Sequence, residues 1–245
     1  MSRERISADV WPAVIYAIGD VHGCRNQLDQ LLAQIKVDAA DIAGEKWIVM
    51  LGDYVDRGPQ SAGVLDLLCA APPAGFKRIC LAGNHEVMFL EFLDNPRTEA
   101  DWLRYGGIET LQSYGIVGET FGGKDMNARR AILASHIPDE HIDLLKSLPV
   151  MISLPDTVFV HAGVRPGVLL QEQAEADLIW MREPFLGYDG ALPYRVVHGH
   201  TPESDPVVLP HRIGIDTAAY ATGVLTALKM TPGGAIEFFN TARSS

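Results

Sequence analysis

The sequence is poor in cysteine and has none of the cysteine spacings that bind metal or form a disulfide framework. Only Cys24, Cys69 and Cys80 occur in 245 residues, an odd number without a C-x-x-C pair. Neither a disulfide scaffold nor a thiolate zinc site is therefore predicted. A set of unpaired thiols is typical of a protein from a reducing compartment.

Long hydrophobic runs are also missing. The apolar stretch at 10–18 contains Pro12 and runs directly into Gly19-Asp20, and no small-residue cleavage site follows it. Nothing approaches the roughly 18 uninterrupted apolar residues of a membrane span. We therefore expect a cytoplasmic protein with no membrane partner.

An excess of positive charge is absent as well. The chain has 20 Lys and Arg against 31 Asp and Glu, a formal net charge of −11. This balance opposes unaided binding to nucleic acid or to an anionic membrane surface, and it suits bound cations. No linker of Pro, Ser or Gly divides the chain, so residues 1–245 are predicted to form a single domain, and an apolar content of 47% is ample for one core. The sequence gives no signal of an oligomeric state.

The first third repeats a unit of strand, polar loop and helix three times. The short apolar runs at 13–18, 46–51 and 76–81 predict strands, and the helical spacing of leucines predicts helices at 26–36, 60–70 and from 87. Three such units in succession indicate an α/β fold with a mainly parallel sheet. Because the carboxyl ends of parallel strands meet at one edge, the polar loops are expected to converge there.

The rest of the chain divides into a helical and a β-rich part. Residues 94–148 predict a helical insert, with helical stretches at 99–114, 125–136 and 139–148. The last third predicts further short strands that form a second, more antiparallel sheet, at 150–154, 158–160, 194–197, 207–209, 212–215, 224–230 and 236–239.

Five loops after predicted strands contain residues that bind metal ions. The central loop, 52–58, would by itself fit an exposed Asp–Arg turn equally well, but the other loops favour a metal site. Carboxylate, amide and imidazole donors suit divalent manganese, iron or zinc. A shared carboxylate at Asp53 would hold two ions about 3.5–4 Å apart, the arrangement used for displacement at phosphorus. The candidate ligands are Asp20, His22, Asp53, Asn84, His161 and His200.

Five motifs in order together resemble one family. They are Gly-Asp-Val-His-Gly at 19–23, Gly-Asp-Tyr-Val-Asp-Arg-Gly at 52–58, Gly-Asn-His-Glu at 83–86, His-Ala-Gly at 161–163 and Gly-His-Thr at 199–201. This set resembles the calcineurin-like metallophosphoesterases, specifically the phosphoprotein phosphatase group with its bacterial and phage members. The resemblance implies two packed mixed β-sheets flanked by helices, with the helical insert.

The resemblance also implies roles for individual residues. One divalent ion would bind Asp20, His22 and Asp53, and the second would bind Asp53, Asn84, His161 and His200; manganese is the expected metal, with iron or zinc as alternatives. His85 resembles the general acid, and Asp56 would orient its ring. Arg57 and Arg182 resemble the two phosphate clamps.

Three residues are assigned less directly. His198 lies two positions before His200 and would face the same side if the strand continued; we favour His200 as the ligand, because the family places it in the middle of Gly-His-Thr. Tyr220 is predicted to be an interior turn residue rather than part of the cleft, and Tyr105, at helical spacing from Trp102, is predicted to belong with it to the core.

Three functions are weighed. The main interpretation is a serine/threonine protein phosphatase, a phosphoric monoester hydrolase with a phosphoprotein substrate that is attacked directly by a dimetal-activated water. The alternative is a symmetrical bis(5'-nucleosyl)-tetraphosphatase or a broad phosphatase of small phosphoesters. Asp56 and Glu86 favour the first, because the tetraphosphatase branch commonly has a non-acidic residue and an aspartate there. A catalytically inactive metal-binding regulator would lack a ligand or the acid, and every position is filled.

Overall fold

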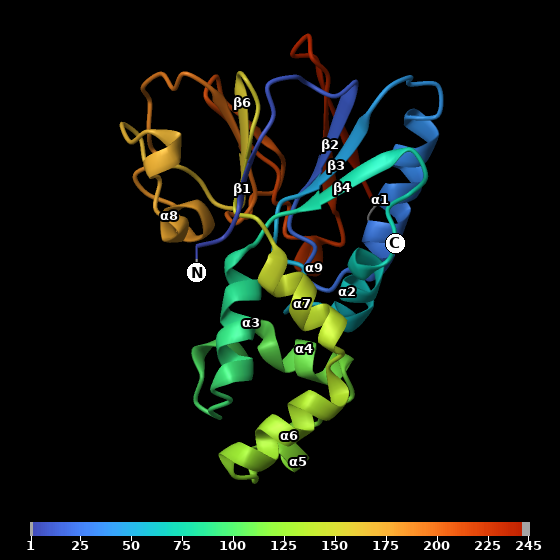
Figure 1. Ribbon diagram of the computed structural model, residues 1–245, viewed down its shortest axis with the longest axis vertical. Helices are drawn as coiled ribbons and strands as arrows, with labels where there is room; N and C mark the ends of the chain where they lie inside the picture. The colour runs from blue at the N-terminus through green and yellow to red at the C-terminus, as the bar shows by residue number, and fades with distance from the viewer. Residues whose placement is uncertain (1, 242–245) are drawn as a thin grey trace.

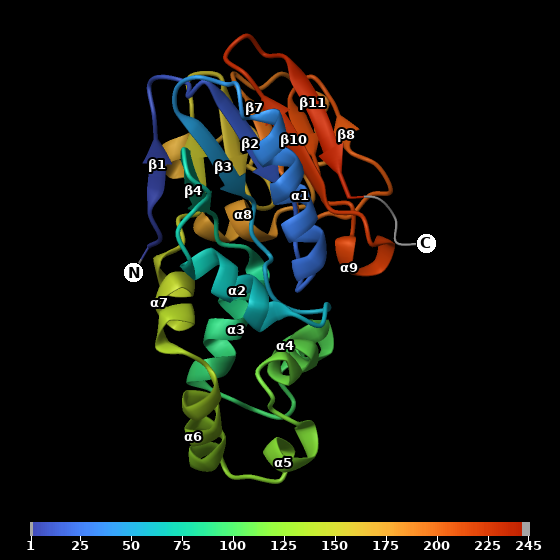
Figure 2. The ribbon, with the colours of Figure 1, turned by 90° about the vertical axis from the view of Figure 1, so that its right-hand side faces the viewer.

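The structure of the protein is a computed structural model that describes residues 2–241, with the backbone alone at 119 and 120. Two mixed β-sheets occupy one end of the molecule, and the helices of the insert extend from the other end (Figures 1 and 2). The predicted fold class is confirmed. In the described part of the chain, no helix is long and apolar enough to cross a membrane.

The first sheet contains the three parallel strands that the sequence predicts. Strands β2 (Val14–Ile18), β3 (Lys46–Met50) and β4 (Phe76–Cys80) pair in parallel and in chain order. Strand β10 (Thr226–Met230) pairs antiparallel with β2, and β11 (Ile236–Asn240) pairs antiparallel with β10. The assignment of these last two strands to the second sheet is therefore wrong.

The second sheet is mixed rather than mainly antiparallel, which corrects the prediction. Its order is β1-β5-β6-β7-β9-β8, and the pairs β1·β5, β6·β7 and β7·β9 are parallel. The strand β1 was not predicted. The bounds are β1 Arg5–Ser7, β5 Met151–Ser153, β6 Thr157–Val160, β7 Arg195–His198, β8 Val207–Val208 and β9 Arg212–Gly214.

Helices cover the outer face of the first sheet and build the insert. Helix α1 buries Leu28, Leu31, Leu32 and Ile35 at helical spacing, and α3 begins at Asn84, three residues before the predicted start. The described part of the insert is helical without a strand, as predicted, although η1 is a π-helical turn. The helices are α1 Arg25–Asp38, α2 Ser61–Cys69, α3 Asn84–Asp94, η1 Leu103–Gly107, α4 Ile108–Ser113, α5 Gly118–Gly122, α6 Met126–His136, α7 Asp139–Ser147, η2 Leu170–Glu172, α8 Glu175–Trp180 and α9 Ala219–Thr222.

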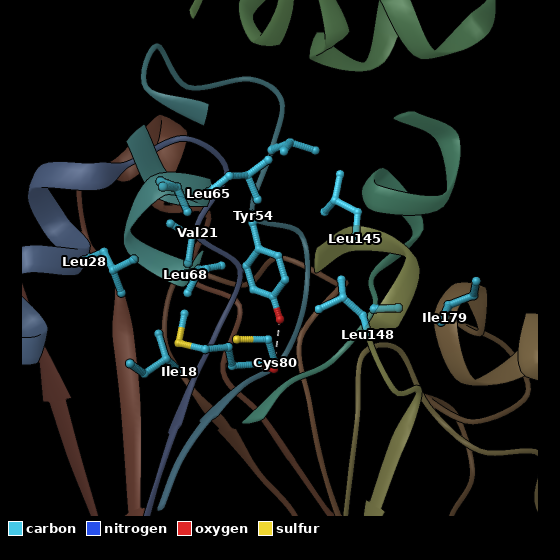
Figure 3. Packing of buried hydrophobic residues seen from close by; sticks show 14 of the residues in the cluster. Ile18, Val21, Leu28, Tyr54, Leu65, Leu68, Cys80, Leu145, Leu148 and Ile179 are labelled. Carbon is cyan, nitrogen blue, oxygen red and sulfur yellow. Dashed lines mark hydrogen bonds between the residues drawn. The ribbon is translucent and has the colours of Figure 1, made fainter. Parts of the chain in front are cut away.

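The core has two layers because side chains alternate along each strand. In β2, Ile15 and Ala17 pack between the two sheets, whereas Tyr16 and Ile18 belong to the cluster under the helices. Figure 3 shows Tyr54 within this second cluster, and its hydroxyl donates to the carbonyl of Leu81 at 2.6 Å. The loop after β3 is thereby anchored in the core rather than left mobile on the surface.

Candidate metal centre

The five polar loops converge at one edge, as parallel strands require. Asp20 follows β2, Asp53 follows β3, and Asn84 begins α3 just after β4. His161 and His200 follow β6 and β7 of the other sheet. All five side chains are buried. Distant parts of the chain therefore meet in one small polar centre between the sheets and the insert.

Asp53 lies between two groups of histidines. One group contains His22, Asp53 and His85, and the other contains Asp53, His161 and His200; within each group the ligand atoms lie within 4.8 Å of one another. Asp53 Oδ2 is 3.5 Å from His22 Nε2, and Oδ1 is 3.3 Å from His161 Nε2. The two oxygens of one carboxylate thus face opposite sides, which suits a bridging ligand.

The imidazoles are oriented by the backbone. His22 Nδ1 donates to the carbonyl of Val55 and His161 Nδ1 donates to the carbonyl of Leu51, both at 2.8 Å. Each ring therefore turns Nε2 toward Asp53, and such hydrogen bonds are typical of metal-binding histidines. Asn84 Oδ1 lies 3.0 Å from His161 Nε2 and 2.9 Å from His200 Nδ1, so its amide oxygen faces the second group.

Asp20 approaches the centre from the side. Its carboxylate accepts the backbone N–H of His200 at 3.0 Å, and burial together with the nearby Asp216 raises its pKa well above the usual range. Burial opposes the charge of Asp53 too, but His161 and His85 outweigh it and hold the Asp53 pKa well below normal. No lysine or arginine within residues 2–241 forms an ion pair with any of these carboxylates.

This donor set fits divalent cations. Two buried aspartates, Asp20 and Asp53, without a lysine or arginine partner are costly in a dry interior, and a divalent ion would offset that cost. Burial also lowers the pKa of His22 and of His200 to about 3, so both rings are neutral and free to donate a lone pair. Oxygen and imidazole donors without thiolate match the ions predicted from the sequence.

His85 and Asp56 form a buried pair beside the centre. His85 Nδ1 donates to Asp56 Oδ2 at 2.6 Å, and its Nε2 lies 3.9 Å from Asp53 Oδ2. Burial lowers the pKa of His85, but Asp53 and Asp56 outweigh it and raise the pKa above its usual value. His85 is close enough to act as a ligand, and its raised pKa together with its place in the cavity wall suits a general acid.

The insert supplies two partners of Asp56 that the sequence did not indicate. Trp102 Nε1 donates to Asp56 Oδ2 and Thr110 Oγ1 donates to Oδ1, both at 2.7 Å. Both oxygens of this fully buried carboxylate are therefore held. Helical spacing predicted only that Trp102 packs in the core, which it does against Phe89 at 5.0 Å. No sequence signal identified the partner of its indole N–H.

Glu86 is a second residue that was missed as part of the centre. Its carboxylate accepts the backbone N–H groups of Asp53 at 2.8 Å, of Tyr54 at 2.7 Å and of Gly83 at 2.9 Å, with that of Val55 at 3.4 Å. The signal that would have found it is a glutamate three residues after a helix N-cap. Glu86 therefore ties the loop after β3 to the start of α3.

Two arginines border a cavity of about 160 Å³ over the centre. Arg57 Nη1 lies 2.8 Å from His22 Nε2 and its Nη2 lies 3.1 Å from His85 Nε2. Arg182 is exposed and lines the same cavity together with Asp53 and the other central side chains. The two guanidinium groups therefore reach the space where an anion would meet bound cations.

Backbone strain is concentrated here. Within residues 2–241, six residues other than glycine have positive φ, and five of them are predicted site residues: His22, Asp53, Asp56, Arg57 and His200. The sixth, Ala218, directly precedes α9, which contains Tyr220. Such conformations cost about 1–3 kcal/mol each and are typical of functional sites.

Three of the less direct assignments can now be compared with the structure. The extended backbone ends at His198, whose ring lies against Phe185 and 3.3 Å from Arg212 Nη1, away from Asn84. The prediction that Tyr220 is an interior residue is wrong, because it is 40% exposed and its ring lies 4.8 Å from the guanidinium carbon of Arg57. The assignment of Tyr105 to the core is also wrong, since it is 54% exposed.

Comparison with known proteins assigns the family. Residues 13–222 match the family described as calcineurin-like phosphoesterase, which is most of the chain. The chain belongs to this phosphoesterase family. The predicted family is thereby confirmed, and the clustered histidines and aspartates are suited to the divalent metal that the resemblance implies.

Relatives of known name fall into two groups. The asymmetrical bis(5'-nucleosyl)-tetraphosphatase PrpE of Oceanobacillus iheyensis is 25% identical, with 86% of each chain covered. A symmetrical bis(5'-nucleosyl)-tetraphosphatase of Janthinobacterium is 26% identical over 88% of this chain and 92% of the relative. Serine/threonine-protein phosphatase 1 of Salmonella typhimurium is 27% identical over 93% of this chain and 96% of the relative. In all three comparisons the similarity covers most of this chain and most of the relative.

Proposed function

We propose that this phosphoesterase binds two divalent metal ions and hydrolyses bis(5'-nucleosyl) polyphosphates. The observation that supports a two-ion centre is the position of Asp53, whose two oxygens face separate groups of histidines. The tetraphosphatase relatives, aligned over most of their length, support the substrate class. These relatives favour the tetraphosphatase, the alternative interpretation of the sequence, over the serine/threonine protein phosphatase, its main interpretation.

Six side chains would hold the ions. When bound, two divalent ions supply positive charge that stabilises a phosphorus transition state and lowers the pKa of coordinated water. The first site would use Asp20, His22 and Asp53, and the second would use Asp53, Asn84, His161 and His200. Manganese is the proposed metal.

The remaining residues act on the substrate. Arg57 and Arg182 would bind the equatorial oxygens of the attacked phosphate, because guanidinium groups match phosphate geometry and oppose the growing charge. His85 would give the proton on Nε2 to the leaving oxygen, and Asp56 would hold the ring by its Nδ1–H. The small volume of the cavity, about 160 Å³, suits a group of the size of a phosphate.

A serine/threonine protein phosphatase is the second candidate. The acidic residue at Asp56, the glutamate at Glu86 and the Salmonella relative favour it. The two functions share the metal centre and differ in what lies beyond the phosphate. Hydrolysis rates on diadenosine tetraphosphate and on a phosphothreonine peptide, measured side by side with manganese, separate them. A kcat/KM a hundredfold higher on the peptide would reject the tetraphosphatase proposal.

The metal centre itself is tested with Asp53→Asn. The variant keeps the shape but loses the charge that faces both histidine groups, so the bound metal should fall and hydrolysis of p-nitrophenyl phosphate should drop by at least about a thousandfold. Metal content is measured by elemental analysis. Asp29→Asn, a change at an exposed aspartate, is the matched control. Full activity and metal content in Asp53→Asn would exclude a bridging role.

A further inference from the structure

A second cavity adjoins the metal centre. It has a volume of about 460 Å³ and runs from the centre along α3 and the start of the insert. Met88, Tyr105 and Trp180 line both this groove and the smaller cavity over the metal ligands. Tyr105 comes from the π-helical turn η1, and Trp180 is the last residue of α8. A ligand can therefore occupy both spaces at once.

The wall shared by the two cavities contains two exposed aromatic rings, Tyr105 and Trp180, and a third exposed ring, Tyr220, lies near the centre. Among the large apolar side chains that are exposed within residues 2–241, three are aromatic: Tyr105 (54%), Trp180 (45%) and Tyr220 (40%). All three border the centre, since Trp180 lies 6.3 Å from the His200 ring and Tyr220 lies 5.4 Å from the His22 ring. Aromatic rings gathered at one cleft rather than scattered over the surface are typical of a binding site.

The space over the metal centre is too small for a whole nucleotide. Its volume of about 160 Å³ lies below the roughly 300–1,000 Å³ of ordinary small-molecule sites, whereas the adjoining groove falls within that range. A phosphate held by Arg57 and Arg182 must therefore leave the rest of its molecule outside the small cavity. The groove is the adjoining space, and Tyr105 and Trp180 lie between it and the small cavity.

We infer that this groove binds a nucleobase of the dinucleoside polyphosphate, stacked against both Tyr105 and Trp180 while a phosphate lies at the metal centre. The inference rests on the proposed function. Every base presents an apolar π-face and polar edges, and the groove offers both kinds of partner. Phe92 and Trp102 form its apolar base, and Asn95, Arg97 and Asp101 add polar groups along its length.

A phosphopeptide is a poorer match to this groove. Peptide recognition commonly uses main-chain hydrogen bonds along a sheet edge or a hydrophobic groove for a helix, whereas the features here are two separate exposed rings beside a phosphate cavity. An aromatic side chain can stack on any of the bases, because each has a π-face. Each such stacking contact increases the affinity by about tenfold. The rings therefore contribute to binding of the substrate rather than to the chemical step.

The experiment compares wild type, Tyr105→Ala, Trp180→Ala and the conservative variants Tyr105→Phe and Trp180→Phe. The readout is the ratio of kcat/KM on diadenosine tetraphosphate to kcat/KM on p-nitrophenyl phosphate, which carries no base. Each alanine variant should lower this ratio about tenfold through a higher KM, and the phenylalanine variants should restore most of it. Leu169→Ala, which removes an exposed leucine outside both cavities, is the matched control and should leave the ratio unchanged.

Adenosine binding provides a readout that needs neither metal nor hydrolysis. Saturation-transfer NMR should detect adenosine, but not ribose, on the wild-type protein, and the signal should fall in both alanine variants. If the wild type does not prefer diadenosine tetraphosphate over the phosphothreonine peptide, the proposed function fails. Loss of the adenosine signal in the alanine variants would still support base binding in the groove. An unchanged ratio in variants of a dinucleotide-preferring enzyme overturns the inference. So does an adenosine signal that survives in both, or a phosphothreonine-peptide activity that depends on the same two rings.

Discussion

Removal of the charge on Glu86 should loosen the metal centre without touching a metal ligand. In the wild type, Glu86 Oε2 accepts the N–H groups of Asp53 and Gly83, and Oε1 accepts those of Tyr54 and Val55. In Glu86→Gln one of these oxygens becomes an amide NH₂, which is itself a donor. Two backbone N–H groups then lose their acceptor in a site that is closed to water.

The size of the effect follows from those two lost bonds. A hydrogen bond to a charged group contributes about 1.5–3 kcal/mol, so the free energy of unfolding should fall by about 3–6 kcal/mol. For a chain of this length, about 1 kcal/mol shifts the melting temperature by about 2–4 °C, so the Tm should fall by at least about 6 °C. Loss of a partner that orients a ligand also weakens metal binding by about 10- to 100-fold.

Two measurements check this prediction. Thermal unfolding in chelator gives the change in stability, and isothermal titration with manganese gives the change in affinity. Glu86→Asp retains the charge but is one methylene shorter, so it should keep some of the four bonds and lie between the wild type and Glu86→Gln. Glu172→Gln makes the same chemical change at an exposed position and should alter neither quantity. A melting temperature of Glu86→Gln within 1 °C of wild type would refute the proposed anchoring.

Three further predictions concern the acid and the ions. His85→Asn should retain metal but slow esters with poor leaving groups far more than p-nitrophenyl phosphate; equal slowing would oppose its role as proton donor. Trp102→Phe should cost about 1–3 kcal/mol of stability and shift reactivity toward good leaving groups, because Asp56 loses a donor; an unaltered dependence on the leaving group would make Trp102 merely structural. Chelation of bound metal should lower the free energy of unfolding by about 2.7 kcal/mol for ions present at 100 times Kd, and a Tm independent of manganese would count against the centre.

The pattern of apolar residues predicted the part of the fold that consists of consecutive strand–helix units. The runs that form β2, β3 and β4 are short, apolar and followed by helical spacing, so each βα unit is encoded within about thirty residues. Strands β10 and β11 carry the same kind of signal, but the place of β10 beside β2 depends on contacts more than 200 residues away in sequence, and β11 pairs with β10. Periodicity defines a strand and not its neighbour, which is why these two strands were assigned to the wrong sheet.

The aromatic residues of the insert were misjudged for a local reason. Spacing along a regular helix placed Tyr105 on the same buried side as Trp102. The backbone has φ of 107° at Gly106 inside a π-helical turn, and this changes the phase of the helix at that point. A Cβ at Gly106 would lie 2.4 Å from the Arg57 nitrogen, so the glycine also permits the insert to approach the central loop. Tyr105 therefore turns outward while Trp102 remains buried.

That close approach explains how the helical insert can affect a centre built on the sheet edges. Gly106 O accepts the Arg57 N–H at 3.2 Å, and Trp102 and Thr110 hold the two oxygens of Asp56. Each of these contacts joins the insert to the strained segment that follows Asp53. Because Asp56 and Arg57 both have positive φ, neither is stable in this conformation without such partners. The insert thus holds the acid and a phosphate-binding arginine in position, and through Tyr105 it also lines the groove inferred to hold the base.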